Sequence, residues 1–90
     1  MHKFNFKNRT AIVTGGAQGF GLDIAKRFLE SGAQVIIWDI DEKLLNSAVD
    51  NVKNLNLSQS VVDISNYQEV EKNVADITSK TNIDILINNA

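Results

Sequence analysis

Glycine is concentrated in one short stretch of this sequence. Four of the five glycines lie in the run from Thr14 to Gly21, Thr-Gly-Gly-Ala-Gln-Gly-Phe-Gly. A β-rich run precedes it, and apolar residues recur at helical spacing after it. Without a Cβ, the backbone can turn tightly and approach a pyrophosphate, and the N-terminus of a helix attracts anions. The stretch therefore predicts a phosphate-binding loop.

The spacing of these glycines differs from two common nucleotide-binding motifs. Gly15, Gly19 and Gly21 give G-x-x-x-G-x-G, whereas many dinucleotide-binding folds show G-x-G-x-x-G. A P-loop requires Lys and then Ser or Thr after its last glycine, but Leu22 and Asp23 follow here. The spacing argues against a kinase or GTPase. A glycine-rich turn without a ligand remains the alternative.

Polar residues follow the later β-rich runs. Asp39 comes 18 residues after Gly21, close to the offset of about 20 at which an acid binds the ribose hydroxyls of a dinucleotide. Asp63 follows the third run, and Asn88 and Asn89 follow the fourth. Each also has a simpler interpretation, since Asp and Asn are common in turns and caps. Together with the glycine loop, Asp39 favours a nucleotide site.

Four β-rich runs alternate with three helical patterns. Helical periodicity begins at Phe20 and stops at Gly32, which suits a left-handed helix end. Asp41 suits the N-cap of the second helix, and Ser65 with Gln68 suits a capping box that opens the third. The alternation predicts an α/β fold with a doubly wound parallel sheet, and right-handed crossovers place its strands in the order 3-2-1-4. The expected strands are 10–14, 34–38, 57–62 and 83–87.

Composition excludes several other classes of protein. The absence of cysteine rules out disulfides, thiolate catalysis and sulfur-based zinc sites, and we expect no metal. A net charge of -2 offers no basic surface for nucleic acid or an anionic membrane. Residues 1–9 lack the apolar segment of a signal peptide and no run of about 18 apolar residues occurs, so we expect neither a signal peptide nor a membrane span. We expect a cytoplasmic protein whose partners include neither nucleic acid nor a membrane.

Four markers in order resemble the short-chain dehydrogenase/reductase family across the whole chain. They are Thr14-Gly-x-x-x-Gly-x-Gly21, Asp39, Val62-Asp63-Ile64 and Asn88-Asn89-Ala90. The extended branch of that family shows T-G-x-x-G-x-x-G, which would place glycine at Gln18. The sequence is therefore more similar to the single-domain branch, which includes 3-oxoacyl-acyl-carrier-protein reductases and polyol dehydrogenases. The resemblance implies a Rossmann-type fold.

The family resemblance also implies a cofactor and roles for individual residues. The parent protein would be an oxidoreductase that transfers hydride between NAD and a small-molecule alcohol or ketone, and it would be a homo-oligomer, either a dimer or a tetramer. NAD is expected over NADP because Asp39 repels a 2′-phosphate, while Gln18 and Ile40 are neutral and no arginine or lysine neighbours Asp39 in the loop. Asn88 would tie the central strands together. The implied cofactor-binding residues are Gly15, Gln18, Gly19, Phe20, Gly21, Asp39, Ile40, Asp63, Ile64 and Asn89.

The catalytic residues of that family have no counterpart in this sequence. The family uses an Asn, a Ser and a Tyr-x-x-x-Lys pair, whereas Tyr67, the only tyrosine, has Glu71 four residues on and Lys72 five residues on. We expect Tyr67 to pack near the start of the third helix, and Trp38 to pack in the core or at the edge of a domain. Residues 1–90 are thus expected to be the N-terminal part of one NAD-binding domain, inactive by itself. The alternatives are a non-catalytic NAD-binding sensor or scaffold and, less favoured, a flavodoxin-like domain.

Overall fold

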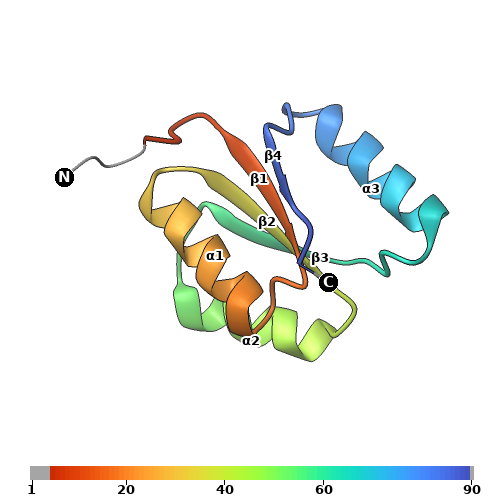
Figure 1. The fold of residues 1–90 in the computed structure, drawn as a ribbon, viewed down its shortest axis with the longest axis horizontal. Coiled ribbons are helices and arrows are strands. Elements are labelled where there is room, and N and C mark those ends of the chain that lie inside the picture. The colour runs from red at the N-terminus through yellow and green to blue at the C-terminus, as the bar shows by residue number, and fades with distance from the viewer. Residues whose placement is uncertain (1–4, 90) are drawn as a thin grey trace.

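The computed structural model describes residues 5–89, and it shows an α/β fold with one parallel sheet (Figure 1). The strands lie in the order β3-β2-β1-β4 and every pair is parallel, which confirms the doubly wound, Rossmann-type sheet expected from the sequence. The elements are β1 (Thr10–Thr14), α1 (Gly19–Glu30), β2 (Gln34–Asp39), α2 (Glu42–Val52), β3 (Leu57–Val61), α3 (Tyr67–Thr78) and β4 (Ile85–Ile87).

Helices cover both faces of the sheet. Figure 1 shows α1 and α2 on one face and α3 on the other. Alternate residues of β2 therefore pack in two hydrophobic cores, one on each face of the sheet. Val35 and Ile37 pack with α1 and α2, whereas Ile36 and Trp38 pack with α3. Trp38 is only 2% exposed, as expected for a core residue. A strand covered on both faces explains why residues 34–38 are almost continuously apolar.

The ends of the helices confirm two sequence expectations and correct a third. Gly32 has φ +93°, the left-handed stop expected after α1, and the Asp41 carboxylate accepts a hydrogen bond from the N–H of Leu44 at the start of α2. The predicted capping box of Ser65 and Gln68 is wrong. Asn66 caps α3 by accepting from Glu69 N, and the Ser65 hydroxyl instead donates to Asp63 at 2.6 Å.

Strand boundaries differ from expectation mainly in β4, which begins at Ile85 instead of residue 83. Asp84 occupies the position before it. The Asp84 carboxylate accepts from Thr10 N at 2.9 Å, while Asp84 N donates to Thr10 O at 2.9 Å. The Asp84 side chain thus accepts from the N–H of Thr10, which would otherwise pair with the backbone of β4. β2 is one residue longer than expected and β3 one residue shorter.

No helix within residues 5–89 is long and apolar enough to cross a membrane.

Candidate cofactor-binding site

The glycine loop connects the end of β1 to the start of α1. Gly15 and Gly19 have φ of +60° and +57°, the left-handed region that residues with a Cβ rarely adopt. The N–H of Gly16 donates to the Trp38 carbonyl at 3.1 Å, which fastens the loop to the end of β2. The loop therefore lies at the carboxyl edge of the sheet, where open α/β folds bind ligands.

The glycines of the loop meet two different surroundings. A Cβ on Gly16 would lie 2.7 Å from the Ile37 side chain, and a Cβ on Gly21 would collide with the carbonyl of Gly15. A Cβ on Gly19 would have no heavy atom of the described residues within 4 Å. Gly16 and Gly21 are thus required by packing inside the protein, whereas the backbone at Gly19 borders open space.

Thr14 joins this loop to the end of β4. Its hydroxyl accepts from the N–H of Asn89 at 2.9 Å and donates to the Asn88 side-chain carbonyl at 3.1 Å. Asn89 also donates from its side-chain amide to the Gly15 carbonyl at 3.4 Å. The expected tie between central strands through Asn88 is confirmed. Its centre, the Thr14 hydroxyl, was missed by the sequence analysis, which gave Thr14 no role beyond the motif. Ala90 lies outside the described residues.

Asp39 reaches the glycine loop from the end of β2. One carboxylate oxygen accepts from Ala17 N at 3.3 Å and the other accepts from Asp41 N at 3.2 Å. The side chain is partly exposed, so both oxygens retain lone pairs for further donors. Asp39 thus has the turn role given as its simpler interpretation, and it also places a carboxylate against the loop.

Asp63 follows β3 on the same edge. Val62 N donates to the carbonyl of Asp39 at 3.0 Å, so Asp63 begins its turn beside the end of β2. The hydroxyl of Ser65, and then the N–H of Ser65, donate to the Asp63 carboxylate and hold its pKa below the ordinary value of 3.8. Asp63 is therefore an anion at neutral pH.

Three large apolar side chains are exposed along this edge. Phe20 is 73% exposed, Ile40 68% and Ile64 41%, and they follow β1, β2 and β3 respectively. Gln18, also exposed, occupies the N-cap position of α1 without a side-chain hydrogen bond to the first turn. The carboxyl edge thus combines apolar surface, a glycine loop and two carboxylates, a combination that suits a nucleotide with apolar ring faces and polar hydroxyls.

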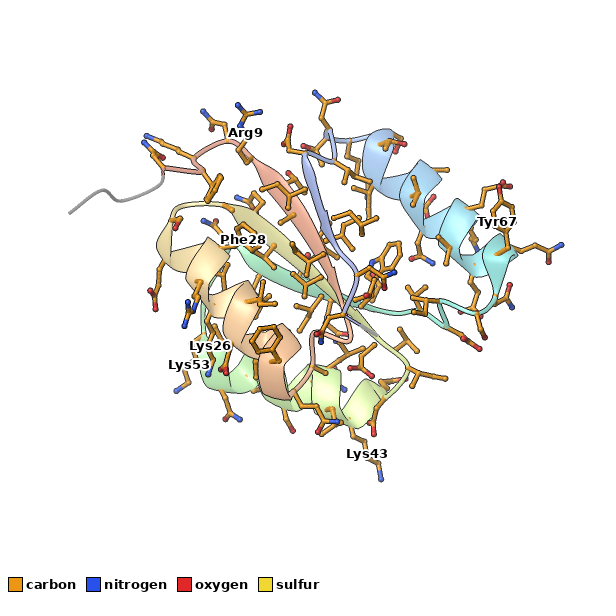
Figure 2. All side chains as sticks on the ribbon, in the orientation of Figure 1. Arg9, Lys26, Phe28, Lys43, Lys53 and Tyr67 are labelled. Atoms are coloured by element: carbon orange, nitrogen blue, oxygen red, sulfur yellow. The ribbon has the colours of Figure 1, made fainter. Side chains whose placement is uncertain are left out.

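Two further features do not contribute to the combination described above. Tyr67 is 75% exposed at the start of α3, so the expectation that it packs there is wrong; its ring extends outward from the helix (Figure 2). A cavity of about 520 Å³ lies between α1 and α2, lined by Leu22, Leu44 and Ala48 among others, and only Ala17 belongs to the glycine loop. Neither feature brings sequence-predicted site residues together.

Comparisons with known proteins agree with this fold. The family model described as short chain dehydrogenase matches residues 9–90. The chain is 39% identical over 87 residues to the 3-oxoacyl-acyl-carrier-protein reductase FabG of Chlamydia trachomatis, and 35% identical over 92 residues to a 3alpha-hydroxysteroid dehydrogenase of Mediterraneibacter gnavus. The alignments cover 92% and 93% of this chain, but 35% and 36% of the two relatives. The chain therefore spans about a third of their length.

A similar solved structure is the Pseudomonas aeruginosa RhlG/NADP active-site complex. It superposes with a TM-score of 0.87 at 30% sequence identity, covering 100% of this chain and 38% of that one. The sheet and the glycine loop described above thus correspond to the first part of a longer known fold.

Proposed function

This chain belongs to the short-chain dehydrogenase family, and from that membership we propose that it forms the cofactor-binding part of an NAD-dependent oxidoreductase. The parent protein would transfer hydride between the nicotinamide and a hydroxyl or carbonyl carbon of a small-molecule alcohol or ketone. The observation that carries the proposal is the Asp39 carboxylate held against the glycine loop by Ala17 N. The relatives named above are a reductase and a dehydrogenase, which favours an enzyme over a non-catalytic sensor or scaffold.

The pyrophosphate would bind at the glycine loop and the first turn of α1. Gln18 gives the first turn no side-chain hydrogen bond, so N–H groups there remain available to phosphate oxygens. Gly19 borders open space, so the backbone can approach the ligand closely. Asn89, held by Thr14 and Gly15, would define the end of the site nearest β4.

The adenosine half would lie across the ends of β2 and β3. Asp39 would accept hydrogen bonds from the ribose hydroxyls, with Ile40 beside the ribose. Asp63 and Ile64 would border the adenine, where a carboxylate can accept from the exocyclic amine and an apolar side chain can cover the ring face. The exposure of Ile40 and Ile64 supports this placement, because a bound ring would remove apolar surface from water.

The choice of NAD over NADP is argued from the charge of Asp39. A 2′-phosphate would add close to two negative charges within a few ångströms of a carboxylate. At an effective dielectric of about 20 each charge contributes roughly 3 kcal/mol of repulsion at about 5 Å, which solvent at this partly exposed site reduces. Gln18 and Ile40 supply no compensating cation. One similar structure is described as an NADP complex. Because proteins of this fold can therefore bind NADP, the preference of this chain for NAD is argued from its own residues.

When bound, the nicotinamide would donate or accept the hydride, and the residues of this chain would bind and orient the cofactor. Residues 1–90 contain no Tyr-x-x-x-Lys pair, the family's acid–base machinery. We therefore assign no catalytic residue within this chain, and we expect no dehydrogenase turnover from it alone, since acid–base catalysis contributes about 10²–10⁴-fold.

Amide chemical shifts of the ¹⁵N-labelled chain during titration with NADH test this proposal. We expect shifts at Gly15 to Gly21, Asp39, Ile40 and Asn89, with little change at Arg9 and Asp84, which pair at the opposite end of β1. No shifts at all, or shifts confined to the cavity between α1 and α2, would contradict the proposed site.

A further inference from the structure

One edge of the sheet has backbone groups directed away from the protein. Within residues 5–89, β3 is an outer strand that pairs with β2 alone. Val35 N donates to Asn56 O, and Val62 N donates to Asp39 O. Because N–H and C=O groups alternate sides along a strand, Leu57, Gln59 and Val61 direct theirs to the free edge. Of these, the N–H of Leu57 is used locally by Asn54 O.

This edge has none of the usual features that prevent pairing with another strand. Residues 57–61, Leu-Ser-Gln-Ser-Val, contain no charge and no proline, and their register with β2 has no bulge. Apolar surface is exposed at both ends of the edge: Leu55 is 104% exposed and Val61 is 43% exposed. An edge of this kind is a template for another strand.

The sequence of β3 is nearly symmetric about Gln59. An antiparallel copy centred there would place Leu57 opposite Val61, Ser58 opposite Ser60, and Gln59 opposite itself. The Gln59 pair would exchange two backbone hydrogen bonds, and each Leu57–Val61 pair would form one, from Val61 N to Leu57 O, because the N–H of Leu57 already donates to Asn54 O. Val61, which is 43% exposed, would lie beside Leu57, which is 6% exposed and packs in the core with α2. Each serine hydroxyl would meet another in a non-hydrogen-bonded pair, where side chains are closest.

Helix α2 extends this symmetry beside the strand. Gln59 donates from its side chain to Asn46 of α2 at 2.7 Å, so the symmetry axis would pass near Asn46. Two exposed charged residues lie on each side of Asn46. Glu42 and Lys43 are in the first turn of α2, and Asp50 and Lys53 are at its other end. Figure 2 shows Lys43 and Lys53 at opposite ends of the helix. In an antiparallel copy, Glu42 faces Lys53 and Lys43 faces Asp50.

The spacing of the layers also permits this arrangement. α2 packs over both β2 and β3. Its counterpart in a second copy would lie about two strand spacings away, roughly 10 Å, which is a normal distance between packed helices. α3 crosses the opposite face towards β4 and does not obstruct the edge (Figure 1).

We propose that the free edge of β3 and the adjoining flank of α2 form a twofold self-association surface, on which a second copy of this chain pairs antiparallel and continues the sheet. Such an isologous contact closes on itself and yields a dimer instead of a fibre. Its central residues, Gln59 and Asn46, are not among the proposed cofactor-binding residues.

Charge reversal on α2 tests the proposal with the full 90-residue chain. Sedimentation velocity over a concentration series should show a monomer–dimer equilibrium. Lys43→Glu or Asp50→Lys should each weaken the dimer by about tenfold, because the symmetry makes two like-charge contacts. The double variant should restore it. Lys43 and Asp50 are seven residues apart on one helix, too far for an intramolecular pair, so recovery must come from contact between copies.

Three controls keep the outcome decisive. Lys72→Glu makes the same charge change on α3 and should leave the dimer unchanged. Gln59→Pro removes an outward N–H that no intramolecular partner uses and should favour the monomer. Circular dichroism of every variant verifies folding. The proposal would be overturned if the chain is a monomer at all concentrations, or if the double variant does not regain the dimer affinity of the wild type. It would also be overturned if the α2 variants leave the dimer unchanged and only Leu86→Asp in β4 dissociates it.

Discussion

The hydroxyl of Thr14 accepts a hydrogen bond from the N–H of Asn89 at 2.9 Å, joining the end of β1 to the residues after β4 across 75 positions of sequence. The same hydroxyl donates to the Asn88 side chain at 3.1 Å, and Thr14 is 4% exposed. One buried oxygen therefore holds the segment that borders the glycine loop.

Thr14→Val should destabilise the fold by about 1–3 kcal/mol, because valine has nearly the same shape but leaves the partners of the hydroxyl unpaired. It should also weaken NADH binding, since Asn89 loses its position against Gly15. Chemical denaturation and NADH titration measure both effects. Thr14→Ser keeps the hydroxyl and is the matched control. Equal stability of the valine variant and the wild type would show that the contact is not important.

Gly21→Ala should lower stability by roughly 1–3 kcal/mol, because its Cβ would meet the Gly15 carbonyl and lie 2.7 Å from the Asn89 amide nitrogen. Gly19→Asn is the matched control: asparagine tolerates the left-handed φ of +57°, and the added side chain enters open space. Thermal melting of the two variants compares them. If the Gly19→Asn variant is less stable than the Gly21→Ala variant, packing requires a glycine at position 19 more than at position 21, which would contradict the structure.

The architecture was predictable because its signals are local and repeated. Alternating apolar strands and periodic helices predicted the strand order, and the glycine run and Asp39 predicted the carboxyl edge as the site. The errors arose where neighbouring polar groups compete. Ser65 and Asn66 both suit an N-cap, and the hydroxyl of Ser65 is taken by Asp63. Nothing local distinguishes these outcomes, since both positions precede the same helix.

Contacts between distant residues were the other part that the sequence did not reveal. Asp84 replaces a backbone partner of Thr10, which shortens β4, and Thr14 meets Asn89 only after the sheet has formed. A threonine at a strand end has many uses, so its type alone indicates no partner. Tyr67 was expected to pack because aromatic rings usually do, but α3 contributes no fully buried residue to the core.

Ser65→Ala should raise the pKa of Asp63 towards its ordinary value of 3.8, because the hydroxyl of Ser65 is the main cause of its lowering. Since the folded pKa lies below the unfolded one, Asp63 contributes stability above pH 3.8 and loses it as the pH falls through the folded pKa. The stability of the Ser65→Ala variant should therefore depend less on pH in that acidic range. Carboxyl NMR titration measures the pKa, with Ser47→Ala as control. An unchanged Asp63 pKa would contradict the assignment.

The most direct test of the proposed cofactor site compares two ligands that occupy only the part assigned to this chain, ADP-ribose and its 2′-phosphorylated form. Calorimetric titration of the 90-residue chain should give tighter binding of ADP-ribose by at least about tenfold, because Asp39 repels the additional phosphate. Asp39→Ser should reduce that difference while the chain remains folded. Equal or tighter binding of the 2′-phosphorylated ligand by the wild type, or no binding of either ligand, would contradict an NAD site at Asp39 and the glycine loop.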